Sequence, residues 1–435
     1  MDPALFCMDN VPIARSYRST SASCSRRWRP GRRLHPVATS PVPFPCSCPA
    51  DSFLSEYCVF ASRFSGNSFT LPRAWAGQPG KGAATSLAKP EGSKRSFPQR
   101  SPATARPIIL GMFQPPMANL NVAILGAPDY GRDLGKKGTV SDLTFYNLKK
   151  GQNTVTFIEP TRYPERLAPL FYAVSMAQKA ILVVDQINPA FGESVIMLDC
   201  ADLKKGMVIL RNYLSREQIA PLIKGTVVDG YEFLEDDKNA LRERLLDDVA
   251  KIESRYDSET GTMPVDHFFN VRGIGTVVLG SVAEGTVRKH DELMVLPGGK
   301  TAQVRSIQKH DEDFDSAGAG ERTGIALKGI EVDDLDRGTI LTNDKSIKQV
   351  SSLTARAELV RYWPSPLKEG MVLHIGHWMQ FVPARIEAVK TEADWHQVEL
   401  TAKLDKMLVY RPGAKGILTY PEGGKLRVVG TIELP

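Results

Sequence analysis

The sequence predicts a multidomain α/β plus β protein, in which a parallel-sheet domain is followed by two small β-barrel domains. From residue 120 to about residue 251, short apolar strands alternate with helical segments, which is the pattern of an α/β domain. After residue 258, short apolar runs are separated by Gly pairs and acidic turns, which is typical of small barrels. We therefore expect domains at 117–258, 259–346 and 347–435, with a linker at 347–352.

The first 116 residues differ in composition from the rest of the chain. They are rich in Ser, Pro, Arg and Gly and lack helical or strand periodicity, so we expect them to be disordered. Three explanations are open: an over-long gene prediction, an organellar transit peptide and a basic binding tail. We favour the first, with a natural start at Met112 or Met117, because MANLNVAILG begins directly with an alternating apolar strand.

Charge is distributed unevenly between these two parts. The first 116 residues hold 15 Lys and Arg against 5 Asp and Glu, which leaves 40 against 44 from the chain totals of 55 and 49. The remainder is therefore mildly acidic. Such a net charge gives no general attraction to a phosphate backbone, so any contact with nucleic acid needs a local basic patch.

Cysteine content and hydropathy bear on the compartment. Cys200 is the only cysteine after residue 116, which excludes a disulfide framework there and fits a reducing cytosol. We therefore expect a cytoplasmic protein. No apolar run reaches the roughly 18 to 20 residues that a membrane-spanning helix needs, so we expect no membrane partner, and the Cys and His spacing predicts no metal site.

The first domain is expected to contain strands and helices in alternation. Strands are expected at 120–126 and 206–212, a hairpin at 144–159, and a buried strand at 179–185. Helices are expected at 165–177, 191–205 and 239–252, the last of them amphipathic.

The β sections are expected to contain only short strands. In the first of them these are GTVVLGSV, ELMVLP, AQVRSI and RTGIAL. In the second they are AELV, MVLHIG, PARIEAV, HQVELTAKL, KGILTY and LRVVGTIEL. Glycines such as Gly273 and Gly275 fall where the strands of a small barrel must turn corners.

The segment from Met263 to Leu341 carries a family resemblance. It begins MPVDHFFNVRGIGTVVLGSVAEG and ends GIALKGIEVDDLDRGTIL, and it resembles the second domain of the elongation factor Tu type of translational GTPase, particularly that of the selenocysteine-specific elongation factor. The resemblance implies a P-loop-GTPase-like first domain that uses GTP or GDP with magnesium. It also implies tRNA or the ribosome as partners, because in the family this barrel helps to hold the 3′ end of aminoacylated tRNA.

The phosphate-binding loop of that family departs from its pattern here. The pattern G-x-x-x-x-G-K-[ST] uses glycines for backbone contacts, Lys for charge and a hydroxyl for magnesium. The chain has GAPDYGRD, in which Gly126 and Gly131 keep the spacing, Arg132 replaces the Lys and Asp133 replaces the hydroxyl. The candidate cofactor-binding residues in this remnant are Gly126, Asp129, Gly131, Arg132, Lys136 and Lys137.

Two further family landmarks are altered. The D-x-P-G-H motif, which senses the γ-phosphate and positions water, corresponds to EPTRY, so that Glu159 stands for the Asp and Tyr163 for the His. The N-K-x-D motif, which recognises guanine, corresponds to RNYL at 211–214, with DCAD at 199–202 as a second alignment that falls more naturally in a helix. No catalytic residue is therefore assigned apart from Tyr163 at the position of the family His.

Together these changes predict a retained fold whose nucleotide chemistry is altered or lost. The first hypothesis is a translation-factor-like protein that binds tRNA or the ribosome with impaired GTP binding and hydrolysis. The second is an active, divergent GTPase in which Arg132, Lys136 and Lys137 replace the usual Lys. The third is a regulatory protein that uses its barrels for protein contacts.

Overall fold

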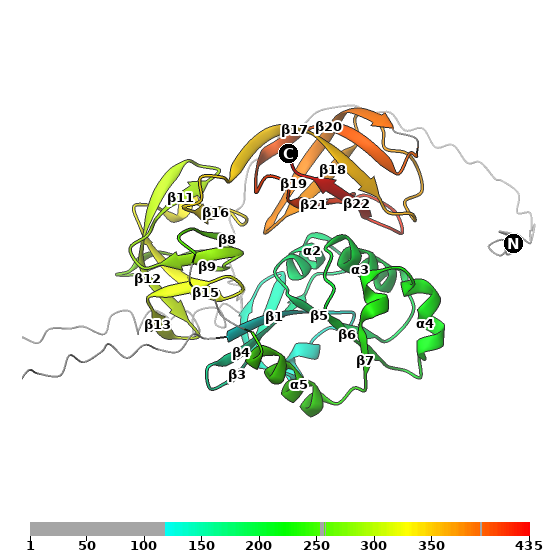
Figure 1. Ribbon diagram of the computed structural model, residues 1–435, viewed down its shortest axis with the longest axis horizontal. Coiled ribbons are helices and arrows are strands. Elements are labelled where there is room, and N and C mark those ends of the chain that lie inside the picture. The colour runs from blue at the N-terminus through cyan, green and yellow to red at the C-terminus, as the bar shows by residue number, and fades with distance from the viewer. Residues whose placement is uncertain (1–117, 253–255, 257, 392–393) are drawn as a thin grey trace, which may run out of the picture. The chain divides into compact units, whose positions relative to one another are not determined.

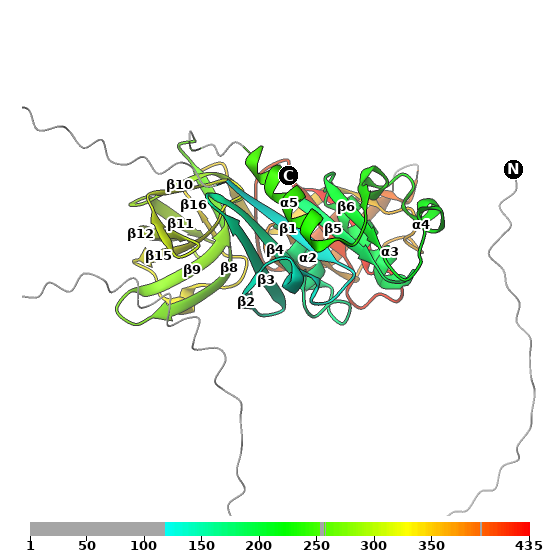
Figure 2. The same cartoon turned by 90° about the horizontal axis from the view of Figure 1, so that it is seen from below.

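A computed structural model describes residues 118–435, apart from 253–255, 257 and 392–393 (Figures 1 and 2). The expectation of a disordered leader, and the choice of start at Met112 or Met117, fall outside the described residues. Within those residues, no helix combines the length and the apolar character needed to cross a membrane.

The first domain is built on a seven-stranded sheet within the described residues, in the order β2-β3-β4-β1-β5-β6-β7. The strands are β1 (Ala118–Leu125), β2 (Lys136–Val140), β3 (Leu143–Lys150), β4 (Asn153–Pro160), β5 (Lys179–Val184), β6 (Gly206–Leu210) and β7 (Glu232–Leu234). β1 pairs in parallel with both β4 and β5, whereas β3 and β4 form the predicted antiparallel hairpin. The predicted fold class is thus confirmed.

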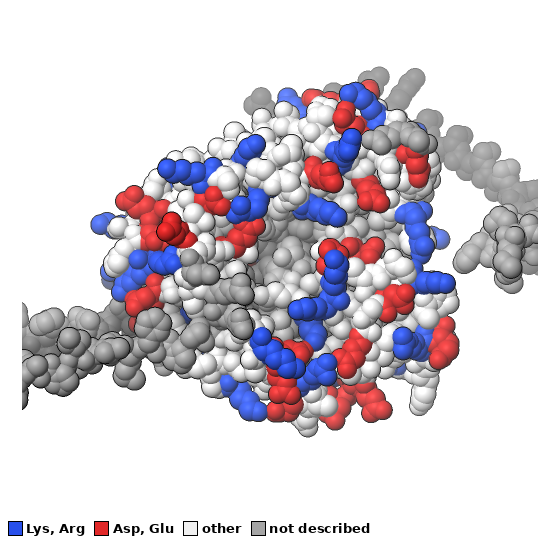
Figure 3. Space-filling view, in the orientation of Figure 1, with Lys and Arg blue, Asp and Glu red and all other residues white. Residues whose placement is uncertain are grey.

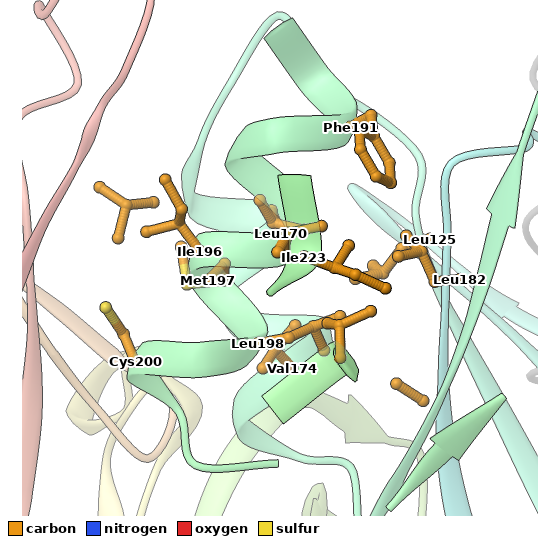
Figure 4. Close-up of a cluster of buried hydrophobic side chains, with 14 of the residues drawn as sticks. Leu125, Leu170, Val174, Leu182, Phe191, Ile196, Met197, Leu198, Cys200 and Ile223 are labelled. Carbon is orange, nitrogen blue, oxygen red and sulfur yellow. The ribbon is translucent and has the colours of Figure 1, made fainter. Parts of the chain in front are cut away.

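Helices pack on both faces of this sheet (Figure 1). They are α2 (Ala168–Ser175), α3 (Pro189–Cys200), α4 (Arg216–Ile223) and α5 (Lys238–Ala250), with short 3₁₀ turns η1 (Tyr130–Asp133) and η2 (Val227–Gly230). Leu170 of α2, Leu198 of α3 and Ile223 of α4 share one buried cluster with Leu125 and Leu182 of the sheet (Figure 4). α5 packs on the opposite face, where Leu241 and Leu245 join a second cluster.

Helix ends follow local capping chemistry. The α3 helix begins after Asn188, whose side-chain oxygen accepts from the Phe191 N–H at 2.9 Å. It ends at Cys200, earlier than the predicted residue 205, because Asp202 adopts a left-handed φ of 51° and the Leu203 N–H bonds back to the Leu198 carbonyl at 3.1 Å. This left-handed closing turn stops the helix, so the prediction overran by five residues of the expected 191–205 range.

The second domain is an antiparallel barrel. Its strands are β8 (Gly261–Val271), β9 (Gly275–Ser281), β10 (Glu284–Arg288), β11 (Glu292–Leu296), β12 (Lys300–Lys309), β13 (Glu312–Phe314), β14 (Ser316–Gly318), β15 (Arg322–Lys328) and β16 (Ile340–Thr342), with one 3₁₀ turn, η3 (Val332–Asp334). The sheet closes on itself because β9 pairs with both β15 and β8. Its interior is filled by apolar side chains of these strands, among them Val278, Val304 and Ile325.

The third domain is a closed barrel with the strand order β17-β20-β19-β18-β21-β22. The strands are β17 (Lys348–Leu359), β18 (Val372–His377), β19 (Gln380–Thr391), β20 (Gln397–Tyr410), β21 (Lys415–Thr419) and β22 (Val428–Glu433). The expected linker at 347–352 is largely absent, because β17 begins at Lys348 and its first residues pair with the end of β20. The prediction of this linker was wrong. The first residues of β17 are mostly polar, and hydrogen bonds between backbones leave no apolar pattern in the sequence from which a strand could be predicted.

We predict that Gly206→Ala destabilises the first domain. A Cβ at this position would lie 2.1 Å from the ring of Tyr231, which is buried and whose hydroxyl donates to the Leu203 carbonyl. Overpacking of this kind costs about 1–3 kcal/mol. Urea denaturation should show this loss, whereas Gly192→Ala inside α3, where a Cβ meets nothing within 4 Å, should stabilise the domain or leave it unchanged. Equal stability of the two variants would contradict the packing argument.

Candidate functional site

A cavity of about 430 Å³ lies at the carboxyl ends of β1, β4 and β5. Its walls come from the loops that begin at Gly126, Pro160 and Asp185, directly after these three parallel strands. From β1 the chain reaches β4 on one side and then crosses to β5 on the other. This is the topological switch point, at which open α/β sheets bind their ligands.

The loop after β1 has the geometry of a phosphate loop only in its first half. Gly126 has a φ of 94°, and a Cβ there would lie 2.0 Å from the Val183 carbonyl oxygen, so only Gly fits. Asp129 follows in the left-handed region, and the next element is the four-residue turn η1 rather than an α-helix. This loop therefore lacks the following helix N-terminus that would favour a phosphate, although the N-terminus of α3, from Asn188 to Ser194, lines the same cavity.

The carboxylate of Glu159 occupies the second half of this loop. Its Oε1 accepts from the Gly131 N–H at 2.5 Å, and only 5% of the residue is exposed. The backbone donor that a phosphate nest would offer is therefore already bonded. Burial, with a further contribution from nearby Asp129, raises the pKa of Glu159 to about 7, although the bond from Gly131 opposes this.

The charged residues that line the cavity are all acidic. Asp129 and Asp185 come from the loops after β1 and β5, and Glu159 comes from the end of β4. In the part of the chain that the structure describes, no Lys or Arg lines the cavity. A nucleoside triphosphate needs cationic partners for its phosphates. These residues therefore do not fit GTP. The described residues also contain no group of three or more Asp, Glu, His or Cys able to hold a metal ion.

The predicted cationic candidates lie elsewhere. The Arg132 side chain is 70% exposed, and its Nε lies 4.0 Å from the neighbouring carboxylate of Asp133. Lys136 and Lys137 lie on the exposed edge strand β2, where they pair with β3. The structure thus brings Gly126 and Asp129 to the cavity wall and Gly131 to Glu159, but it does not bring these three cations to the same place.

Tyr163, at the position of the family His, also lines the cavity. Its hydroxyl donates to the Ala190 carbonyl at 2.8 Å. Burial, followed by the charge of Glu193, raises its pKa. A phenol that stays protonated and already donates its proton cannot act as a general base for water.

Sequence reasoning missed a second polar cluster, at the carboxyl ends of β6 and β7. Asp236 accepts from the Tyr130 hydroxyl at 2.6 Å and from Arg211 Nε at 2.7 Å, and Lys238 donates to it as well. Burial alone would raise the pKa of Asp236, but these bonds lower it to about 2. The sequence contained a signal for this cluster, because the charged residues EDDK at 235–238 directly follow the short strand β7 at the same sheet edge.

This cluster lies where the family motif for guanine was aligned. Arg211 is the first residue after β6, and its guanidinium lies 5.1 Å from the centre of the Tyr130 ring. Its Nε and Nη1 groups face the carboxylates of Asp236 and Asp185. The second alignment does not reach the cavity either, because Asp199 lies in α3 and accepts from the Val227 N–H at 2.8 Å. Neither alignment leaves a carboxylate free for a guanine base.

Comparisons with known proteins agree with this architecture. Residues 275–342 match the family model described as elongation factor Tu domain 2. The uncharacterized protein MJ0325 of Methanocaldococcus jannaschii is 37% identical over 319 residues, which cover 73% of this chain and 100% of that protein. The selenocysteine-specific elongation factor of the same organism is 27% identical over 319 residues, covering 63% of this chain and 67% of the factor.

Solved structures show the same fold. The elongation factor SelB of Methanococcus maripaludis, in complex with the GTP analogue GppNHp, aligns with a TM-score of 0.62 and 23% identity, covering 73% of this chain and 79% of that one. A bacterial selenocysteine-specific elongation factor aligns with a TM-score of 0.59 and 21% identity, covering 72% of this chain and 58% of that one.

We predict that Glu159→Gln stabilises the protein above pH 7. Because burial raises the pKa from 4.5 to about 7, Glu159 contributes full stability below pH 4.5, and this is lost as the pH rises to 7. Gln cannot ionise, yet its side-chain oxygen can still accept from Gly131. The variant should therefore gain up to about 3 kcal/mol at pH 8 and little at pH 4.5.

Urea denaturation at the two pH values measures this difference. Glu165→Gln replaces an exposed carboxylate of the same domain and serves as the control. If Glu159→Gln were less stable than the native chain at pH 8, the ionised carboxylate would be stabilising, and our assignment of its pKa would be incorrect.

Proposed function

We propose that this chain binds tRNA or the ribosome without a GTP cycle. The chain belongs to the elongation factor Tu type of protein, in one family with protein MJ0325 of Methanocaldococcus jannaschii. The observation that carries the proposal is the Glu159 carboxylate bonded to the Gly131 N–H. An internal carboxyl group takes the place at which the family loop would hold a phosphate. The protein would then work as a translation-factor-like binding protein rather than as a GTPase.

Electrostatics supports the loss of nucleotide binding. Two unit charges 4 Å apart interact by about 4 kcal/mol at the effective dielectric constant of a protein surface. In this cavity the phosphates of GTP would lie close to the acidic residues Asp129, Glu159 and Asp185, and no Lys or Arg among the described residues lines it. Exposed Arg132 and the lysines of β2 would have to move into the cavity to offset this repulsion.

A basic depression on the second barrel supports the RNA proposal. It has a volume of about 480 Å³ and is lined by His290, Gln303, Arg305 and Lys328, together with Ile274 and Leu327. No described acidic residue lines it. On the face seen in Figure 3, basic and acidic side chains are intermixed. A phosphate would therefore be attracted by a local basic patch such as this depression rather than by a general positive charge.

We predict that the full-length chain does not bind GTP. Fluorescent GTP and GDP, titrated with and without magnesium, should show no saturable binding up to about 100 μM, which corresponds to less than about 5.5 kcal/mol of affinity. The selenocysteine-specific elongation factor of M. jannaschii provides the comparison protein. Magnesium-dependent binding of GTP at micromolar concentrations would contradict the proposal and favour the divergent GTPase.

We predict that tRNA binding depends on Lys328. Lys328→Ala should weaken binding of bulk tRNA by about three- to tenfold and reduce the salt dependence by about one phosphate contact. Lys204→Ala, which removes an exposed Lys of the first domain, should leave binding unchanged. Gel-shift titrations at several salt concentrations, with and without GTP, measure both effects.

The same titrations can contradict the proposal. If the folded native chain retains neither tRNA nor ribosomes at low salt, translation binding is lost, and the regulatory protein-binding alternative is favoured. A tRNA affinity that rises when GTP is added would also be incompatible with a nucleotide-independent protein.

A further inference from the structure

We propose that the outer edge of β2 pairs with an extended, acidic segment of another protein. The inference goes beyond the RNA binding proposed above and does not depend on it, because β2 lies in the first domain and the basic depression lies on the second barrel. It starts from an open sheet edge whose free charges are all positive.

The strand β2 is the terminal strand of the parallel-sheet domain. It pairs with β3 on one side, and Figure 2 shows it at the margin of the sheet. Among the described residues, no backbone group of β2 bonds to an element other than β3. An edge strand of this kind presents unpaired N–H and C=O groups that can pair with a further strand.

Other open edges in the described part of the chain are shorter. The strands β7, β13 and β14 also pair on one side, and each contains three residues, whereas β2 contains five. The strands of the third domain have no open edge, because that barrel is closed. Thus β2 offers the longest template for an added strand.

The side chains of β2 determine which strand would pair with it. Lys136 and Lys137 are exposed, and no ion pair joins either of them to another described residue. On the neighbouring strand, by contrast, Lys150 pairs with Glu243 at 3.0 Å. Exposed Arg132 lies just before β2. The edge therefore carries positive charge that the chain itself does not compensate.

The strand geometry specifies the partner further. Successive side chains of a strand point to opposite faces of the sheet, so Lys136 and Lys137 flank the open edge on both faces. Both residues are in register with β3, and the register shifts before Val140. A partner strand with two consecutive acidic residues would set one carboxylate beside each Lys, and β-branched residues on either side would favour its extended form.

Other occupants fit this edge less well. A second copy of β2 would bring the same lysines, and like charges opposite each other are destabilising. The first 116 residues hold 15 Lys and Arg against 5 Asp and Glu, and none of these five acidic residues is next to another. RNA phosphates accept hydrogen bonds but donate none, so they would leave the C=O groups of the edge unpaired. An acidic strand of another protein satisfies both the backbone and the lysines.

A labelled hexapeptide tests the pairing. The probe is Val-Thr-Glu-Glu-Thr-Val with both ends blocked, titrated with the full-length chain at low salt and followed by fluorescence anisotropy. It should bind with a Kd of about 100 μM or lower, and added salt should weaken the binding because exposed charges are screened. The peptide with Gln in place of both Glu residues should bind at least about fivefold more weakly.

Two methylated peptides separate backbone pairing from charge. Each is the acidic peptide, N-methylated on one of the two alternate sets of residues, so both keep their carboxylates. Alternate N–H groups of a strand point to the same side. The isomer whose methyl groups face β2 should therefore bind at least about fivefold more weakly, while the other should bind like the unmodified peptide. Hydrogen exchange at residues 136–140 should slow only with the peptides that bind.

Variants locate the binding site. Lys136→Gln and Lys137→Gln should each weaken binding of the acidic peptide by about two- to fivefold, and the double variant should no longer distinguish the Glu peptide from the Gln peptide. Lys204→Gln changes an exposed Lys of the same domain that lies away from β2, so it should bind the acidic peptide like the native chain.

Several results would overturn the inference. These are no binding of the acidic peptide up to about 500 μM protein, equal binding of the Gln peptide, equal binding of the two methylated isomers, or equal loss in Lys204→Gln. Dimerisation of the native chain that the double variant abolishes would assign the edge to a second copy. Loss of tRNA binding in the double variant, with peptide binding unchanged, would assign it to RNA. GTP binding by the native chain would contradict only the proposed function.

Discussion

The hydrogen bond from the Gly131 N–H to Glu159 is the interaction around which the site is organised. It joins the loop after β1 to the end of β4 in a buried setting, with Tyr146 packed against Gly131. A carboxylate in this place supplies the acceptor that the backbone donor requires. It also places a buried carboxyl group, with a pKa raised to about 7, in the wall of the adjoining cavity.

The parallel sheet explains why the three acidic residues Asp129, Glu159 and Asp185 line one cavity. β4, β1 and β5 are neighbours that run in one direction, so their carboxyl ends lie at a single edge. In the solved relatives the same fold appears, and one of those structures holds a GTP analogue. Here the fold is retained while the charged residues that line the cavity at that edge are acidic. A scaffold stabilised by apolar strands does not depend on the chemistry of its loops.

The polar cluster around Asp236 lies at the neighbouring part of the same sheet edge, and its side chains also bond to one another. Tyr130, Arg211 and Lys238 all donate to one carboxylate, which leaves it well satisfied and ionised. In both places, at Glu159 and at Asp236, a carboxyl group bonds to groups of the chain itself at a position where related folds can hold a ligand. The difference is that the Asp236 cluster contains its own cations, whereas the cavity walls contain none among the described residues. Arg211 connects the two clusters, because its Nη1 also lies 3.6 Å from the Asp185 carboxylate of the cavity wall.

The sequence by itself determined the fold class, the hairpin at 144–159, the barrel strands and the departure of GAPDYGRD from a phosphate loop, because these depend on periodicity and local motifs. It did not place Lys136 and Lys137, which the structure puts on edge strand β2, nor did it find Asp185, Asp236 and Lys238. Only the tertiary structure decided that Glu159 bonds to Gly131 and that three carboxylates share one cavity. The physical reason is that such contacts join loops 25 or more residues apart, as the 28-residue separation of Gly131 and Glu159 shows, and their partners are chosen by strand order rather than by neighbouring residues.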